Sequence, residues 1–253
     1  MSTKIISICN HKGGVGKTTT VASLGASLAR LGRSVLVVDL DAQSNLTSSL
    51  MVGEPERTTY EAMKERKSLP VVELPSVPGL FLSPASLDLA GVELEIASYM
   101  EREKILKDVL DEVAGDYDYI LLDCPPSLGL LTLNALTAST DVLIPLTAEA
   151  LPSRGLQRIL DIVSMTQKRL NKELRLAGIL ITRYEKSNLT QTVEEALRGR
   201  YGSLVFETKI RKNVSLAEAP LSMRSILDYA PGSNGAKDYK SLAQEIEKKI
   251  VIR

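Results

Sequence analysis

Short apolar runs recur along the chain and are separated by segments of helical length. The runs are residues 5–9, 35–38, 119–122, 142–146 and 176–181. None of them alternates apolar with polar residues, and continuous runs of this kind are typical of parallel strands covered on both faces. The crossovers between such strands should be right-handed. The pattern therefore predicts an α/β fold with a mostly parallel central sheet and helices on both faces.

Segments between the runs carry apolar residues at three- and four-residue spacing, which predicts the covering helices. They are residues 18–31, 101–113, 153–170 and 189–201. Gly32 and Gly202 stand where helix C-caps belong. Residues 236–250 show a further apolar stripe without a dense basic face, so we expect a closing helix packed on the sheet and not a helix lying on a membrane.

Residues 51–84 differ from the rest of the chain because they hold five prolines and only one short helical pattern, at residues 59–67. We expect a loop-rich excursion at the edge of the sheet, too short to form a separate domain. The chain shows no internal repeat and no low-complexity linker. A length of 253 residues is enough to bury one full-sized core. Residues 1–253 are therefore expected to form a single domain.

Composition narrows the partners and the compartment. Lys plus Arg and Asp plus Glu number 31 each, so only a local charge cluster could attract nucleic acid or membrane. Cys9 and Cys124 are the only cysteines and form no metal or redox motif, so we expect buried thiols in a reducing compartment. No apolar run approaches the roughly 20 residues of a transmembrane helix. These features predict a cytoplasmic protein without stable membrane association.

Residues 10–19 read Asn-His-Lys-Gly-Gly-Val-Gly-Lys-Thr-Thr, directly after the first apolar run and at the start of the first helix. A P-loop requires this strand–loop–helix context. Its glycines let backbone N–H groups surround phosphate oxygens, Lys17 can reach the β- and γ-phosphates, and the Thr18 hydroxyl can bind Mg²⁺. The predicted ligands are ATP and Mg²⁺. The candidate nucleotide-binding residues are Lys12, Gly13, Gly14, Val15, Gly16, Lys17, Thr18 and Thr19.

The loop departs from the common P-loop spacing, which would place a glycine at position 11. This chain has His11 there, followed by a second lysine, Lys12. Lys12 cannot easily reach the γ-phosphate of its own subunit alongside Lys17. We expect it to point outward, toward phosphates held by another subunit. A solvated surface lysine is the alternative.

Three carboxylates follow predicted strands. Asp39 and Asp41 come at the end of the second run, and Asp123 comes at the end of the third. Ligands of open α/β sheets bind at the carboxyl ends of the strands. Asp123 stands where a Walker B aspartate holds Mg²⁺ through a water molecule. Asp41 could instead cap the turn that follows it.

The loop with Lys12, together with residues 35–45, 119–127 and 213–220, resembles the deviant Walker A ATPases, and within them the ParA/Soj partition ATPases. The resemblance covers essentially the whole chain. It implies that Thr18, Asp39 and Asp123 form the metal site. It further implies that Lys12, Lys17 and Asp41 are catalytic, with Asp41 orienting the attacking water, and that Asn213 lines the adenine pocket.

The resemblance also implies partners. An ATP-dependent homodimer would bind double-stranded DNA non-specifically on the nucleoid, and a ParB-type centromere-binding protein would stimulate hydrolysis. The output would be segregation of chromosome or plasmid DNA. Residues 183–224 are the candidate DNA-binding face, since they hold eight basic and five acidic residues, an excess of three. The candidate contacts are Lys186, Arg211, Lys212 and Arg224.

Some positions in this face depart from the family. Relatives carry Pro-Arg-Asn-Val-Arg where residues 211–215 read Arg-Lys-Asn-Val-Ser. A solvated basic face therefore remains an alternative for any one residue. A second alternative is a MinD-like membrane-positioning ATPase, for which residues 246–253 make a poor amphipathic tail. An iron–sulfur carrier would need cysteine ligands that bridge a dimer, and Cys9 and Cys124 are not placed in that way.

Overall fold

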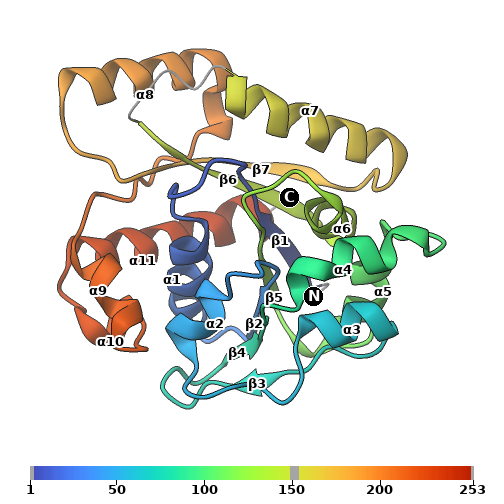
Figure 1. The fold of residues 1–253 in the computed structure, drawn as a ribbon. Helices are drawn as coiled ribbons and strands as arrows, with labels where there is room; N and C mark the ends of the chain where they lie inside the picture. The colour runs from blue at the N-terminus through green and yellow to red at the C-terminus, as the bar shows by residue number, and fades with distance from the viewer. Residues whose placement is uncertain (1–2, 149–153, 252–253) are drawn as a thin grey trace.

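The computed structural model describes residues 3–148 and 154–251, which form a seven-stranded sheet with helices on both faces (Figure 1). The apolar runs form five of its strands, as the sequence predicts. These are β1 (Lys4–Ile8), β2 (Val35–Asp39), β5 (Tyr119–Asp123), β6 (Asp141–Thr147) and β7 (Arg175–Thr182). The strand order is β3-β4-β2-β5-β1-β6-β7, and every pairing except that of β3 with β4 is parallel. The predicted fold class is confirmed.

Residues 51–84 contribute more to the sheet than a loop-rich excursion would. They contain α3 (Thr59–Glu65), β3 (Val72–Glu73) and β4 (Leu80–Ser83). β4 pairs in parallel with β2, and β3 forms the edge of the sheet. The sequence did not predict β4, because this strand has only four residues and prolines at positions 78 and 84 stand on either side of it. The predicted helical pattern at 59–67 corresponds to α3.

The predicted covering helices are present with shifted ends. They are α1 (Lys17–Arg30), α5 (Ile105–Asp111), α7 (Arg154–Arg169), α8 (Asn188–Tyr201) and α11 (Asn234–Ile246), the last followed by the π-helical turn η4 (Glu247–Val251). The expected start of α7 at position 153 lies outside the described residues. The other helices were not predicted: α2 (Asn45–Leu50), α4 (Leu89–Glu95), α6 (Leu130–Ala138), α9 (Ser215–Leu221) and α10 (Ile226–Tyr229). Short 3₁₀ turns are η1 (Ile96–Ser98), η2 (Ala114–Asp116) and η3 (Gly202–Leu204).

Alternate residues of each central strand enter two different cores. Leu36 and Val38 of β2 face the core built with α3–α8, whereas Val35 and Val37 face the core built with α1 and α9–α11 (Figure 1). Both faces are therefore dry, which explains why the runs do not alternate with polar residues. A Cβ on Gly25 would lie 2.9 Å from Cγ1 of Val37. This close approach fixes α1, and with it the loop at its start, against the sheet.

The carboxyl ends of three neighbouring strands meet at one edge of the sheet. β1 lies next to β5, and β2 lies on the other side of β5. Asp123, the last residue of β5, is in register with both Ile8 and Asp39. The segments that follow these strands therefore converge. Separately, no helix within residues 3–148 and 154–251 has the length and apolar content to cross a membrane.

Candidate nucleotide-binding and catalytic site

The loop between β1 and α1 is anchored at both ends by neighbouring strands. Asn10 donates from Nδ2 to the carbonyl of Pro145 at 2.7 Å, and its Oδ1 accepts the N–H of Lys12 at 3.0 Å. On the other side, the Thr182 hydroxyl donates to the carbonyl of Val15 at 2.8 Å. Gly16, the N-cap of α1, has a φ of 84°, which favours glycine. The loop is thus preformed at the positive end of α1.

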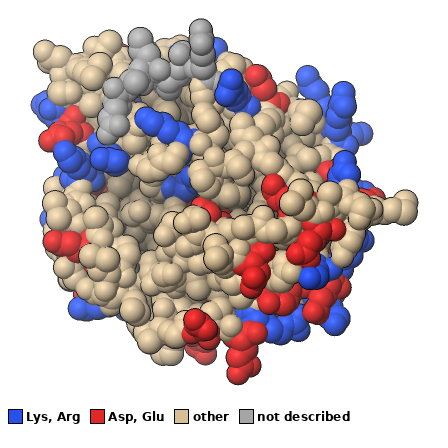
Figure 2. Space-filling model, in the orientation of Figure 1, with Lys and Arg blue, Asp and Glu red and all other residues tan. Residues whose placement is uncertain are grey.

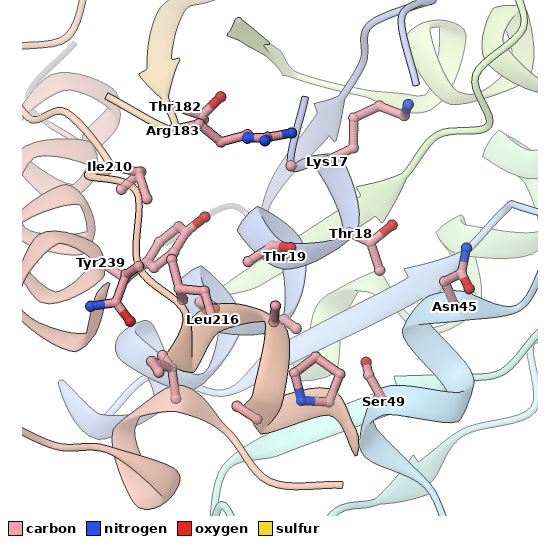
Figure 3. A pocket seen from close by; sticks show the side chains of 18 of the residues that line it. Lys17, Thr18, Thr19, Asn45, Ser49, Thr182, Arg183, Ile210, Leu216 and Tyr239 are labelled. Carbon is pink, nitrogen blue, oxygen red and sulfur yellow. The ribbon is translucent and has the colours of Figure 1, made fainter. Parts of the chain in front are cut away.

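The first turn of α1 carries the predicted phosphate ligands. Lys17 is 7% exposed and points along the loop, and Thr18 faces the carboxyl ends of the strands (Figure 3). Thr20 lies one turn deeper, and its hydroxyl is 3.1 Å from the hydroxyl of Tyr239 in α11. Backbone amides, an ammonium group and a hydroxyl therefore converge as a phosphate site requires.

Asp123 has the environment of a cation ligand. Its side chain is buried, and neither carboxylate oxygen has a hydrogen-bond partner among the described residues. Burial and the neighbouring Asp39 carboxylate raise the pKa of Asp123 well above its ordinary value, while Thr18 and Lys17 act in the opposite direction. An unpaired buried carboxylate is costly, and a divalent cation would relieve that cost. The oxygens of Asp123 and Thr18 are of the kind that Mg²⁺ prefers, so the residues present fit this ion.

Asp39 plays a different part from Asp123, because protein donors already occupy both its oxygens. Oδ2 accepts the N–H and the hydroxyl of Thr47 at 2.9 and 2.7 Å, and Oδ1 accepts the N–H of Asp41 at 3.1 Å. Burial raises the pKa of Asp39 to about 6, against the effect of these hydrogen bonds. Asp39 therefore holds the turn that carries Asp41 and the start of α2. This support of the metal site is indirect.

Asp41 is half-buried and lines the cavity beside the loop. Its Oδ1 accepts the N–H of Gln43 at 3.0 Å, so the carboxylate does cap the turn that follows. The capping occupies one oxygen. The turn cap considered for Asp41 is thus present, and the same side chain lies in the cavity wall, where orientation of the attacking water stays a prediction.

The cavity extends from the phosphate loop to an apolar end and has a volume of about 800 Å³ (Figure 3). Leu50, Leu216 and Ile226 line the apolar end, together with Tyr239. Asn213 also lines the cavity, and its Oδ1 is buried without a hydrogen-bond partner among the described residues. We call residues 207–213 the pocket segment, since this stretch follows η3, pairs with the chain just after β7 through the bridge of Tyr184 with Arg211, and enters the cavity wall. The shape suits a nucleotide, with its phosphates at the loop and its base at the apolar end.

Lys12 lies outside this cavity. Its side chain is exposed, and it is not among the described residues that line the cavity wall. Its backbone N–H is held by Asn10, so the residue is fixed at the rim of the loop. The side chain therefore does not share the position of Lys17.

The candidate DNA-binding residues differ in how firmly they are already engaged. Arg211 binds both oxygens of Asp238, with 2.5 Å from Nη2 to Oδ1, and this contact raises the pKa of Arg211. Lys212 lies 3.2 Å from Glu185, in a pair whose side chains are 61% and 69% exposed. Arg224 donates to the carbonyl of residue 228 at 2.6 Å. Lys186 is exposed, and no polar contact is found for it among the described residues.

Basic side chains gather around the mouth of the cavity, at the left of Figure 2. Acidic side chains gather over α3 and α4 on the opposite side of this view. This face of a neutral protein thus has a basic region at the cavity mouth and a separate region that is rich in acidic side chains.

Several residues of the site were not identified from the sequence. Thr47, Thr182, Arg183 and Tyr239 carry no motif, and their roles come from contacts between distant segments. Arg183 had one usable signal, since it follows a predicted strand and the carboxyl edge of the sheet was the expected site.

The fold and the site define a P-loop ATPase. A family model described as an AAA domain matches residues 3–176. The chain is 43% identical to the sporulation initiation inhibitor protein Soj of Bacillus subtilis, over 96% of this chain and 98% of that protein. The chain therefore belongs to the family of ParA and Soj chromosome-partitioning ATPases.

Solved structures agree with this assignment. The chain is similar to the cobyrinic acid a,c-diamide synthase from Mycobacterium smegmatis with bound ADP and magnesium, with 37% identity, a TM-score of 0.83, and 96% and 93% of the two chains covered. It is also similar to MinD from Pyrococcus horikoshii complexed with Mg-ADP, with 27% identity, a TM-score of 0.79, and 97% and 96% covered. The predictions of an ATP hydrolase and of ATP and Mg²⁺ as its ligands are confirmed.

Proposed function

We propose that this protein is an ATP-driven switch that segregates chromosome or plasmid DNA. Two ATP-bound subunits form a homodimer, and the dimer binds double-stranded DNA on the nucleoid without sequence preference. A ParB-type centromere-binding protein then stimulates hydrolysis and release. The observation that carries the proposal is Lys12, an exposed lysine fixed at the rim of the phosphate loop and outside the cavity of its own subunit.

Each residue of the site has a part in hydrolysis. Lys17 and the backbone N–H groups of residues 13–19 hold the phosphates, and Thr18 and Asp123 hold Mg²⁺, which neutralises phosphate charge when bound. Asp41 orients the attacking water from the turn that Asp39 fixes. Positioning and charge stabilisation supply most of the catalysis in phosphoryl transfer, so Asp41 need not deprotonate the water fully.

Asn213 is the proposed contact to the base. Its Oδ1 is buried and has no hydrogen-bond partner among the described residues, and a buried acceptor of this kind is costly. The exocyclic amino group of adenine is a donor, whereas guanine presents a carbonyl oxygen at the same ring position. The orphan acceptor therefore favours ATP over GTP.

The basic residues divide into strong and weak candidates for DNA contact. Lys186 is exposed, and the exposed pair of Lys212 with Glu185 is weak enough for phosphates to replace the glutamate. Arg211 is held by Asp238, whose side chain is only 10% exposed, so moving the guanidinium to DNA would leave a buried carboxylate without its cationic partner. We therefore rank Lys186 and Lys212 above Arg211, with Arg224 beside the cavity mouth.

The test is binding to arbitrary-sequence duplex DNA with ATP, with ADP and without nucleotide, at one fixed salt concentration. Asp41→Ala should bind ATP but not hydrolyse it, and so should hold the DNA-bound state. Binding only with ATP supports the switch. The double variant Lys186→Ala and Lys212→Ala should weaken binding to all sequences alike, and Arg211→Ala should weaken it less.

Failure to bind DNA in any nucleotide state would overturn the proposal. The similarity to MinD suggests a second result to look for in the same experiment. ATP-dependent co-sedimentation with vesicles of anionic phospholipid, in place of DNA binding, would indicate a membrane-positioning ATPase.

A further inference from the structure

Arg183 directly follows β7 and is fixed beside the phosphate loop. Its backbone lies in the left-handed region, with a φ of 50°, which a residue other than glycine adopts only where its surroundings hold it. The preceding residue, Thr182, is bonded to the phosphate loop through the carbonyl of Val15. The following residue, Tyr184, donates its N–H to the carbonyl of Ile210 at 2.9 Å. Arg183 is thus placed between the loop and the pocket segment.

The side chain of Arg183 is directed at the cavity. Figure 3 shows it extending from the end of β7 toward Lys17. Of the described residues that line the cavity, the basic ones are Lys17, Arg183, Arg211, Lys212 and Arg224. The last three contact Asp238, Glu185 and the carbonyl of residue 228, respectively, and Arg183 also has an interaction within the chain. What distinguishes Arg183 is its direction, because its side chain extends toward Lys17 beside the phosphate loop.

We propose that Arg183 binds the phosphate chain of the nucleotide, as a second cation in the same subunit as Lys17. A nucleotide that spans the cavity from the apolar end to the phosphate loop must pass the end of β7. The planar guanidinium offers five N–H donors in a fork that matches two phosphate oxygens. This role concerns nucleotide binding alone and does not depend on DNA binding or dimerisation.

The size of the effect follows from what Arg183 must give up. Arg183 is exposed and already has an interaction within the chain. The nucleotide would have to replace that interaction. A charge-assisted hydrogen bond made under these conditions strengthens binding by about tenfold.

The experiment compares Arg183→Lys with Arg183→Met by calorimetric titration of the apo protein with Mg-ADP. Both substitutions are unbranched and suffer the same left-handed backbone, so they differ mainly in charge. Arg57→Met is the control, since Arg57 is an exposed arginine that pairs with Glu65 near α3, away from the cavity. Thermal unfolding of each apo variant shows whether it is folded.

We expect Mg-ADP to bind about tenfold more weakly to Arg183→Met, with an intermediate loss for Arg183→Lys and none for the control. High salt should narrow the difference between the parent and Arg183→Met. Binding of Arg183→Met at the parent affinity would overturn the proposal. A loss for Arg183→Met that high salt leaves unchanged would also overturn it, because salt should weaken a contact between a cation and phosphate. A parent that binds ADP but no DNA would remove the proposed function and leave this role of Arg183 intact.

Discussion

Asp238 in α11 binds the guanidinium of Arg211 with both carboxylate oxygens and accepts the backbone N–H of Arg211 at 2.9 Å. The side chain of Asp238 is 10% exposed, and that of Arg211 is 44% exposed. The carboxylate thus anchors the backbone of the pocket segment as well as one side chain. An exposed ion pair alone would contribute much less.

Removing the two partners should therefore have unequal effects. Asp238→Ala should lower the free energy of unfolding by about 2 kcal/mol, because it removes the backbone and the side-chain contacts together. Arg211→Ala keeps the backbone hydrogen bond and should cost about 1 kcal/mol. Urea denaturation measures both. Lys212→Ala, which breaks only the exposed pair with Glu185, is the matched control and should change stability by less than about 0.5 kcal/mol. Equal losses for Asp238→Ala and Lys212→Ala would contradict this assignment.

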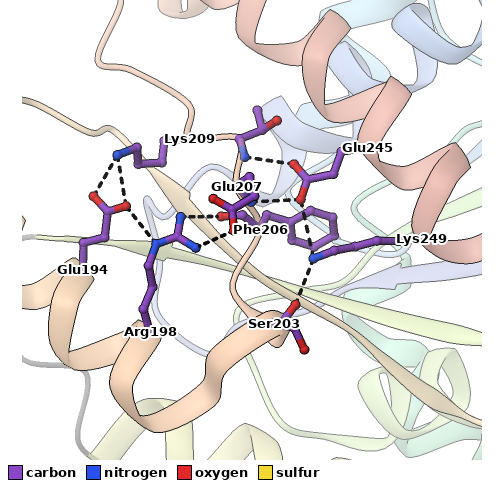
Figure 4. Close-up of polar contacts among 9 residues, drawn as sticks. Glu194, Arg198, Ser203, Phe206, Glu207, Lys209, Glu245 and Lys249 are labelled. Carbon is purple, nitrogen blue, oxygen red and sulfur yellow. Dashed lines mark hydrogen bonds and ion pairs between the residues drawn. The ribbon is translucent and has the colours of Figure 1, made fainter.

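Glu245 anchors the other end of the pocket segment, as Figure 4 shows. Its oxygens accept the N–H groups of Glu207 and Thr208, both at 2.9 Å. Nearby, Glu194 of α8 binds Lys209 at 2.8 Å. Carboxylates from α8 and α11 therefore hold the pocket segment between them. Burial raises the pKa of Glu245, but the N–H groups of Thr208 and Glu207 outweigh burial, and the net pKa is lowered from 4.5.

The lowered pKa predicts an acid-dependent stability. A carboxylate whose pKa is lower in the folded state stabilises the fold above its unfolded pKa, and this stability is lost as pH falls through the folded pKa. The parent should therefore lose more stability than Glu245→Gln when the pH falls below about 4.5. Urea denaturation at neutral and acid pH measures the difference. Glu173→Gln, in an exposed turn, should follow the parent. If the stability of the parent and of Glu245→Gln depends on pH in the same way, the Glu245 carboxylate does not stabilise the fold as proposed.

The two cysteines give a prediction about reactivity. Sγ of Cys9 lies 2.7 Å from Sγ of Cys124, and both are free thiols with 1% exposure. Burial and the neighbouring Cys9 raise the pKa of Cys124 well above its ordinary value. Since the thiolate is the reactive form, native protein should react very slowly with an aromatic disulfide reagent, and both thiols should react after unfolding in urea. Fast labelling of the native protein would show that the site opens readily.

The sequence predicted the centre of the sheet because burial on both faces leaves a plain signal. β1, β2, β5, β6 and β7 each contain a short run of mostly apolar residues without alternation. β4 gives no such signal, because it has only four residues and a proline lies near each end. α6 was missed for the opposite reason. Its sequence, Leu-Leu-Thr-Leu-Asn-Ala-Leu-Thr-Ala, is apolar on nearly every side, so it shows no stripe.

Residues of the site likewise differ in whether a local sequence motif marks them. The phosphate loop and Asp123 were predictable because glycine spacing and a strand-end carboxylate are local features of sequence. Thr47 and Tyr239 were not, since the first acts through Asp39 and the second through Thr20, across 8 and 219 positions of chain. Such contacts exist only once the tertiary fold has formed.

The position of Lys12 leads to the most direct test of a shared active site. Lys12 is exposed at the rim of the loop, while Asp41 lines the cavity of its own subunit. In the proposed dimer, each complete site takes Asp41 from the subunit that holds the nucleotide and Lys12 from the partner. Lys12→Gln and Asp41→Ala should each reduce the ATPase rate by about 100-fold or more when assayed alone.

Mixing the two inactive variants distinguishes the partner's lysine from the subunit's own. In a mixed dimer, the Lys12→Gln subunit keeps Asp41 and receives an intact Lys12 from the Asp41→Ala subunit, so one of the two sites is complete. An equimolar mixture should therefore recover about a quarter of the parent ATPase activity, because half of the dimers are mixed and each has one working site. If Lys12 serves its own subunit, neither site of the mixed dimer is complete, and the mixture stays inactive. Lys17→Ala mixed with Asp41→Ala is the control, since both residues act on the nucleotide of their own subunit, and this mixture should recover nothing.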